Sequence, residues 1–443
     1  MTRKSESNII VNKKKYKKIL PEYLELIDSL DSEFKSVIEE SIGLTKLVNF
    51  KDNYKISKHN WFAYKQGYSS VLVEKILKEE NPPQNTYVID PFTGVGTTNL
   101  VANKLGYNSI GFDINPVATL AANVKTTNFS SAQINHIKSL INNFDPKESS
   151  TNIPSSSLMQ KAFTSDVFEK LMKIKGFYET IEDKKIQSFF KLAYLSIIED
   201  CSNRVKDGNG IKIAKNKKQI SNIFEYYNKK CGAMISDLDA SNKRTKSFII
   251  NASITNKSAM EHLRDKPVGL VVFSPPYANC FDYLELYKLE LWMGGFVNSY
   301  ADFHKYRSQA LRSHVNASFD HTIKNSNRNV DLVAETISCF NVWNKNIPDM
   351  VRGYFDDMTE VFKILHRIME PNSKCFIIVA NSAYRGVLVP TDLLLTKIAG
   401  NNGFSISKIL IARRIRASSQ QMKELYKQYG NLTRESVVVL ERK

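Results

Sequence analysis

The chain lacks the features of a membrane-spanning or secreted protein. No apolar run reaches the roughly eighteen residues that a bilayer-crossing helix needs. The N-terminal segment MTRKSESNIIVNKKKYKK is charged and has no apolar core, so we expect no secretory signal. Cysteine is scarce, with only five residues in the chain. They are widely spaced and form no C-x-x-C pair. These absences predict a cytoplasmic protein with reduced thiols and no membrane contact.

Metal-binding and phosphate-gripping patterns are also missing. The seven histidines are scattered, no H-E-x-x-H motif occurs, and the cysteines lack zinc-ligand spacing. No G-K-[ST] signature of a phosphate-gripping loop follows the glycines discussed below. We therefore expect neither a metal ion nor a P-loop.

Basic residues, by contrast, are in excess. Lys and Arg number 62 against 45 Asp and Glu, which gives a net charge of +17 and a pI near 9.4. Such an excess favours a polyanionic partner, nucleic acid before a membrane surface. A merely basic protein is the alternative on charge alone. The length of 443 residues allows two to three domains, or one large domain with insertions.

Short strands and helices alternate in separate parts of the chain. TYVID (86–90) and NSIGFDIN (108–115) predict strands that end on acids, and each is followed by a helical pattern. This β-α-β-α order is typical of a parallel sheet covered by helices. We expect one α/β domain assembled from residues 61–125, 247–296 and 346–443. A helical segment at 1–60 would precede it, and a mainly helical basic insertion at 126–246 and a second insertion at 297–345 would interrupt it.

The first motif is DPFTGVGTT (90–98), placed between a predicted strand and a predicted helix. Gly94 and Gly96 allow a tight turn and a close approach of the backbone to a ligand. Asp113, which ends the next strand, is placed to accept hydrogen bonds from ribose hydroxyls. Asp90 at the head of the loop would repel a pyrophosphate but attract a cationic amino-acid group. The loop therefore favours S-adenosylmethionine over NAD.

The second motif is SPPY (274–277), which directly follows an apolar strand pattern. The Ser274 hydroxyl and the Pro275 carbonyl can accept both N–H bonds of an exocyclic amine on a nucleobase, and the prolines fix their directions. Tyr277 offers a ring on which an extruded base can stack. Asp282 and Glu285, a few residues later, are interpreted as the polar face of the following helix.

Together the two motifs resemble those of the amino-methyltransferases that methylate exocyclic nitrogens of DNA bases. This resemblance implies a class I, Rossmann-like fold with a seven-stranded, mostly parallel sheet and one reversed strand in its last hairpin, at 404–412 and 435–442. It also implies S-adenosylmethionine as cofactor and site-specific methylation of double-stranded DNA, with N4 of cytosine favoured by the Ser-Pro-Pro-Tyr form. A restriction endonuclease partner follows by analogy with the family.

The resemblance also implies roles for individual residues. The acid that meets the cofactor's adenine amine in many members is missing; Asn256 and Ser258 are candidates for its place, and the contact stays unassigned. The Pro-Cys nucleophile of enzymes that attack cytosine C5 is absent. The implied catalytic residues are Ser274, Pro275, Pro276 and Tyr277, and the implied cofactor-binding residues are Asp90, Phe92, Gly94, Gly96, Asp113, Lys65 and Gly67.

Basic residues in the insertions and near the C-terminus are candidates for nucleic-acid contact, because Arg suits guanine and Lys suits phosphate. The alternatives for function are N6-adenine DNA methylation, methylation of an RNA base, and a catalytically silent nucleic-acid-binding protein. The basic candidates are Arg204, Lys206, Arg307, Arg312, Arg413, Arg414 and Arg416.

Overall fold

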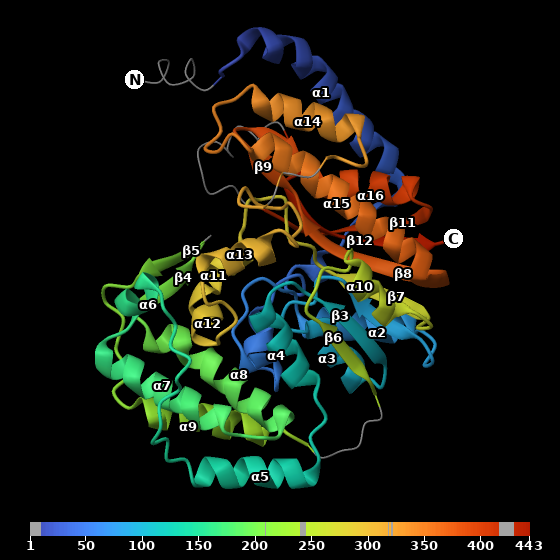
Figure 1. The fold of residues 1–443 in the computed structure, drawn as a ribbon. Coiled ribbons are helices and arrows are strands. Elements are labelled where there is room, and N and C mark those ends of the chain that lie inside the picture. The colour runs from blue at the N-terminus through green and yellow to red at the C-terminus, as the bar shows by residue number, and fades with distance from the viewer. Residues whose placement is uncertain (1–9, 209, 240–244, 318, 320–321, 416–428) are drawn as a thin grey trace.

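The computed structural model describes residues 10–208, 210–239, 245–317, 319, 322–415 and 429–443. Figure 1 shows a twisted sheet with helices on both faces, and a separate group of helices beside one end of it. No helix within the described ranges is long and apolar enough to cross a membrane.

The described chain forms a sheet of eight strands in the order β1-β11-β12-β8-β7-β2-β3-β6. Neighbours run parallel except for β12, which is antiparallel to both β11 and β8. This topology confirms the expected fold class, and the short β1 adds an edge strand to the seven expected. The strands are β1 (Ile38–Glu40), β2 (Tyr87–Asp90), β3 (Asn108–Phe112), β6 (Ser247–Ile250), β7 (Val268–Phe273), β8 (Met369–Ala380), β11 (Phe404–Arg414) and β12 (Arg434–Arg442).

Both faces of this sheet are buried, which explains why the β7 sequence VGLVVF is apolar at every position. Alternate residues face opposite sides: Val271 packs in the cluster under one helical layer, and Val272 packs in the cluster under the other. The first layer consists of α1 (Lys13–Phe34), α14 (Arg328–Ser338), α15 (Ile347–Ile368) and α16 (Thr391–Asn401), and the second contains α2 (Ser70–Glu80) and α3 (Thr97–Lys104).

The first insertion folds around a hydrophobic interior of its own, which continues onto α4 (Pro116–Thr126). A β-hairpin of β4 and β5 interrupts the predicted helices, and it occupies the turn-rich, basic part of this region. The elements are α5 (Ser131–Asn142), α6 (Ser157–Ala162), α7 (Ser165–Glu179), α8 (Lys184–Cys201), β4 (Arg204–Asp207), β5 (Gly210–Ile213) and α9 (Ile223–Ser236).

The second insertion is only partly separate from the domain, because its helix α14 packs against α15 and α1 in the layer over the sheet. Short elements complete the described structure. They are η2 (Lys35–Val37), η3 (Ile42–Leu44), η4 (Lys51–Lys55), η5 (His59–Trp61), α10 (Lys257–Met260), η6 (Glu261–Leu263), α11 (Tyr283–Leu286), α12 (Lys288–Met293), α13 (Tyr300–Arg307), β9 (Ser382–Tyr384) and β10 (Val387–Val389).

Candidate active site

A cavity opens at the carboxyl ends of β2, β3, β6 and β7, the edge where open parallel sheets bind ligands. The glycine loop (residues 90–98) lines this cavity from Asp90 to Val95. The proline corner (residues 274–277) lines the same cavity with Ser274 and Pro276. Two motifs that are far apart in the sequence therefore share one space. Its other lining residues are Tyr64, Gln66, Gly67, Tyr68, Thr97, Asp113, Ile114, Asn115, Ala252, Ser253, Asp282, Tyr283, Leu284, Gln309, Ala310, Leu311, Ser313 and His314.

The glycine loop needs both of its glycines for geometric reasons. Gly94 and Gly96 have φ angles of 49° and 82°, in the left-handed region that favours glycine. A Cβ on Gly96 would lie 2.8 Å from the Ala122 Cβ of α4. Gly96 thus allows the loop to pack closely against α4. Gly94 lies at the cavity wall, where a Cβ would come within 3.1 Å of the Tyr64 ring.

Two carboxylates, the buried Asp90 and the half-buried Asp113, form the floor of this cavity. Asp90 is 1% exposed and accepts hydrogen bonds from the Tyr68 hydroxyl at 2.8 Å and the Phe92 amide at 2.9 Å. Asp113 accepts from the Gly94 amide at 2.9 Å. Burial raises the pKa of Asp90 to about 7 and that of Asp113 to about 6, although the hydrogen bonds oppose the shift.

This floor fits a cationic ligand. No Lys or Arg is among the described residues that line the cavity, so no internal cation compensates the two acids. A ligand that brought a positive charge would offset part of the cost of ionising them. S-adenosylmethionine carries an ammonium and a sulfonium group, and the residues present are therefore suited to it.

The proline corner faces two ways. Ser274 lies at the cofactor-side cavity, but Tyr277 does not line it. Instead, Tyr277 lines a second cavity on the other side of the corner, where its hydroxyl donates to Glu435 Oε1 at 2.8 Å. Pro275 is buried and lines neither cavity.

Three residues considered for cofactor contact lie away from the cavity. Lys65 does not line the cavity, because its Nζ turns to the Lys206 carbonyl at 3.4 Å, while its neighbour Gly67 does line it. Asn256 caps α10 by accepting from the Ser258 amide, and neither residue lines the cofactor-side cavity. Ala252 and Ser253 occupy that part of the wall. Phe92 lines the cavity as expected, with its ring 5.6 Å from that of Phe273.

The sequence interpretation missed several cavity residues. Asp282, assigned to a helix surface, is 4% exposed, caps α11 and forms an ion pair with Arg307 at 2.8 Å. His314 is 3% exposed, and its Nδ1 has no hydrogen-bond partner among the described residues. Burial lowers the pKa of His314, which favours the neutral ring. No local pattern marks His314, whereas the D-x-x-E spacing of 282–285 resembles a helix cap.

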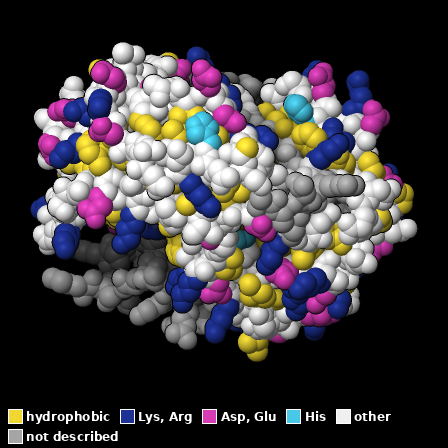
Figure 2. All heavy atoms as spheres, turned by 90° about the horizontal axis from the view of Figure 1, so that it is seen from below, with side chains coloured by type: hydrophobic (Ala, Val, Ile, Leu, Met, Phe, Trp, Pro, Cys, Tyr) yellow, Lys and Arg dark blue, Asp and Glu magenta, His cyan; other side chains and the backbone are white. Residues whose placement is uncertain are grey.

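Most of the basic candidates are paired within the protein. Lys206 is 8% exposed and contacts Glu199 and Glu290, and Arg312 is 6% exposed, so neither is an exposed nucleic-acid contact. Arg204 is half-buried, and Arg414 pairs with Glu40. On the face in Figure 2, Lys and Arg side chains are spread among Asp and Glu side chains. Arg416 lies outside the described residues.

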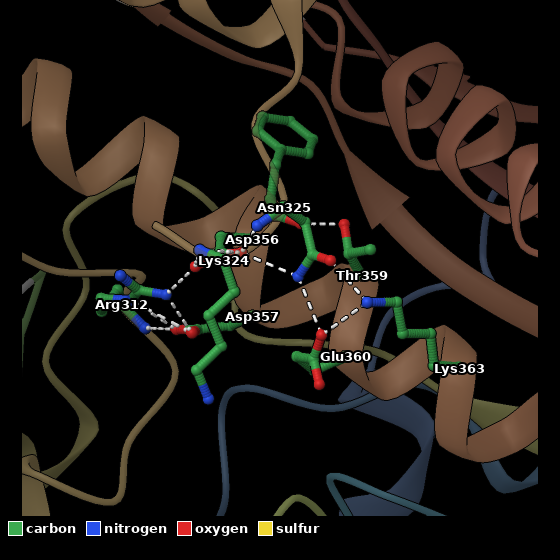
Figure 3. A network of polar contacts seen from close by, with 9 residues as sticks. Arg312, Lys324, Asn325, Asp356, Asp357, Thr359, Glu360 and Lys363 are labelled. Atoms are coloured by element: carbon green, nitrogen blue, oxygen red, sulfur yellow. Dashed lines mark hydrogen bonds and ion pairs between the residues drawn. The ribbon is translucent and has the colours of Figure 1, made fainter. Parts of the chain in front are cut away.

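Arg312 instead fastens the second insertion to α15 (Figure 3). Its guanidinium donates to Asp356 Oδ2 at 2.7 Å, and its backbone amide donates to Asp357 Oδ2 at 2.8 Å. Further along, Asn325 Nδ2 donates to Glu360 Oε1 at 2.8 Å. These contacts are costly to break, because loss of one partner would leave a buried charge unpaired. They therefore hold the segment that brings Gln309, Ala310, Leu311, Ser313 and His314 to the cavity wall.

Within the described chain, no group of three or more His, Cys, Asp or Glu residues is arranged to hold a metal ion. The five cysteines are buried and unbridged.

The chain is similar in sequence to known DNA methyltransferases. A sequence model of the DNA methylase family matches residues 2–123. The Type II methyltransferase M.BsoBI of Geobacillus stearothermophilus is 26% identical over 475 aligned residues, which cover 93% of this chain and 91% of that protein. Type II methyltransferase M.AvaI of Nostoc sp. is 25% identical and covers 87% of both chains. Type II methyltransferase M.MvaI of Kocuria varians is 22% identical over 75% of this chain and 79% of its own.

Proposed function

Because the chain belongs to the S-adenosylmethionine-dependent DNA amino-methyltransferase family, we propose that it methylates N4 of cytosine at specific sites in double-stranded DNA. The observation that supports this most directly is that Ser274 and the Asp90–Gly94 loop line a single cavity. A base amine held at the corner would then meet the cofactor within one water-poor space.

In this proposal the protein binds and orients its substrates without forming a covalent bond to them. S-adenosylmethionine, when bound, supplies an electrophilic methyl group. Asp90 attracts its cationic amino-acid end, and Asp113 accepts hydrogen bonds from its ribose. The amine of cytosine is a poor nucleophile because its lone pair is delocalised into the ring. The Ser274 hydroxyl at the cavity wall accepts one of its N–H bonds and localises that pair, and the Pro275 carbonyl accepts the other once the corner shifts to expose it.

The target base would have to leave the duplex to reach this corner. Tyr277 supplies an aromatic face for an extruded base, which compensates part of the lost stacking. Cytosine is preferred over adenine because the corner begins with Ser274, the form that the family associates mainly with N4 of cytosine. N6 of adenine is the second candidate, because the matching family as a whole acts on both kinds of amine.

The relatives named above are Type II methyltransferases. By that likeness we propose that this chain protects DNA beside a restriction endonuclease of the same specificity. Purification of the chain from its native cells, followed by identification of DNA-cleaving activity with the same recognition sequence, would test this part.

The base assignment is tested with purified protein, duplex DNA and cofactor labelled in the methyl group. Digestion of the product to nucleosides should give labelled N4-methylcytosine, and Ser274→Ala should reduce the label strongly while cofactor binding persists. Labelled N6-methyladenine as the only product would reject the cytosine assignment. A parallel reaction with structured RNA should remain unlabelled, and preferential labelling of the RNA would favour the RNA alternative.

A further inference from the structure

A second cavity adjoins the proline corner on the side away from the cofactor loop. It lies where β7, β8 and β11 end and where the antiparallel β12 begins, so it shares the sheet edge with the first cavity. Its volume of about 460 Å³ falls in the range of roughly 300–1,000 Å³ that is typical of small-molecule sites. Its lining residues are Tyr277, Asn279, Ala380–Tyr384, Arg413–Ile415 and Glu435.

A chain of polar contacts leads from the catalytic corner into this cavity. The Tyr277 hydroxyl interacts with the Ser274 side chain and donates to Glu435 Oε1 at 2.8 Å. The other carboxylate oxygen, Oε2, accepts from Arg413 Nε. Glu435 is only 3% exposed. One buried carboxylate therefore fixes the tyrosine ring with one oxygen and an arginine with the other.

The strand register explains why these groups meet. Glu435 pairs with Arg413 on β11 and with Ala380 on β8, so it lies between the two neighbouring strands. The side chain of Arg413 remains 41% exposed. Among the described residues, the guanidinium of Arg413 donates a hydrogen bond from Nε to Glu435. Its two terminal nitrogens therefore keep N–H donors for a ligand in the cavity.

These donors match one base edge better than the other. When the N4 hydrogens of cytosine are held, the adjacent edge presents two acceptors side by side, N3 and then O2. The corresponding edge of adenine presents one acceptor, N1, followed by a C–H group. A guanidinium offers paired N–H donors in a rigid fork, and flipped bases are recognised through this edge. Two donors are therefore satisfied by cytosine but only one by adenine.

We propose that Arg413, oriented by Glu435, is a specificity-determining residue that donates to N3 and O2 of the flipped cytosine in this second cavity. This inference rests on the proposed function, and it makes Arg413 the residue that distinguishes cytosine from adenine. Glu435 is the positioning residue, because it fixes the side chains of Arg413 and Tyr277 relative to each other.

The experiment begins with the wild-type chain, whose recognition sequence is identified by sequencing the methylated DNA of expressing cells. Arg413→Met is then compared with Lys408→Met, which removes a positive charge from the same strand. Lys408 is exposed and pairs with Glu39 at the edge strand. We expect Arg413→Met to lower kcat/KM on the target duplex by about 5-fold to 150-fold, the range of one good bidentate base contact. The Kd for S-adenosylmethionine should stay within about twofold, and Lys408→Met should behave as wild type.

An abasic duplex separates base recognition from phosphate contact. If Arg413 reads the base, wild type and Arg413→Met should bind equally well to DNA whose target cytosine is replaced by an abasic site. A deficit that persists on the abasic duplex, together with a salt dependence reduced by about one unit of slope, would assign Arg413 to a phosphate and overturn the proposal.

Glu435→Leu tests the positioning role without removing the arginine. Leucine is close to glutamate in size but accepts no hydrogen bond, so the contacts from both Tyr277 and Arg413 are lost. We expect the same loss on the target duplex as for Arg413→Met, and little further loss in the double variant. Full additivity of the two changes would contradict the coupling. Methylation of adenine by the wild type would overturn both proposals, whereas cytosine methylation that Arg413→Met leaves intact would overturn this inference alone.

Discussion

The two regions that interrupt the sheet are held in place by different forces. In the first, between α5 and α9, aromatic side chains interlock: the ring of Phe190 lies 5.4 Å from those of both Phe177 and Phe189. In the second, α14 shares the hydrophobic core over the sheet, whereas the segment around Arg312 is tied to α15 by ion pairs (Figure 3). The first region carries its own hydrophobic interior, and the Arg312 segment of the second is fixed by a few charges.

This difference has a consequence for the active site. The first region has many apolar contacts, which are non-directional and tolerate small shifts in position. The second supplies Gln309, Ala310, Leu311, Ser313 and His314 to the wall of the cofactor-side cavity, and hydrogen-bonded ion pairs fix the direction of this segment closely. We therefore expect damage to the first region to appear mainly as lost stability, and damage to the second to appear also as lost cofactor affinity.

The largest effect is expected from Phe190→Ala. Phe190 is 1% exposed, and removal of a buried phenylalanine ring typically costs about 3–5 kcal/mol of unfolding free energy. Urea denaturation monitored by circular dichroism measures this loss, with Phe248→Ala, a 36% exposed residue, as the control. The fraction that stays folded should bind S-adenosylmethionine with unchanged affinity. A tenfold weaker affinity in that fraction would erase the distinction between the two regions.

The second effect is expected from Arg312→Met. This change leaves Asp356 and Asp357 without their cation, and breaking a buried pair in this way costs about 3–5 kcal/mol when the charges stay buried. Since Asp357 is a quarter exposed, we expect the lower end of that range. The cavity wall should also loosen, and the Kd for S-adenosylmethionine measured by calorimetry should rise by about tenfold, or 1.4 kcal/mol.

Gly353→Ala tests the same contact without removing any charge. A Cβ on Gly353 would lie 2.7 Å from the Arg312 Cδ, so the arginine would have to move. We expect a smaller rise in Kd in the same direction, although alanine by itself favours the helix by about 1 kcal/mol. If both variants lose stability but bind cofactor normally, the ionic contacts would be structural only.

Sequence reasoning located the two motifs because their geometry depends on adjacent residues. The loop 90–98 and the corner 274–277 carry their geometry in local glycines and prolines, and the apolar pattern of β7 placed the corner at the right edge of the sheet. The fold class followed from the alternation of strands and helices. In each case the physical cause is local, so one stretch of sequence is sufficient to show it.

The roles of the basic residues were not predictable in this way. Lys206 and Arg312 differ from exposed cations only in their partners, which lie far along the chain: Lys206 meets Glu290, and Arg312 meets Asp356. An excess of positive charge therefore did not identify which cations are free. His314 likewise reaches the cavity wall on a segment that Arg312 ties to α15, and no nearby residue in the sequence marks this.

A pH series tests the two carboxylates of the cavity floor, Asp90 and Asp113, which lie outside both inserted regions. The folded-state pKa of Asp90 is about 7 against an ordinary value of 3.8, so the free protein binds this proton more tightly than the unfolded chain does. The contribution to stability is therefore fully present below about pH 4 and is lost as the pH rises through about 7.

Cofactor binding should have the opposite sign, because the ionised carboxylate attracts the cationic ligand. The Kd for S-adenosylmethionine should fall as the pH rises from about 6 to 8, by up to about tenfold over this whole range. Asp90→Asn should weaken binding, flatten this part of the profile and raise the melting temperature of the free protein at pH 8 more than at pH 5. Arg312→Met, in contrast, should weaken binding while keeping the same pH profile. If Arg312→Met also removed the pH dependence, the wall and the floor would act as one unit, and the second inserted region would belong to the cavity as fully as the glycine loop does.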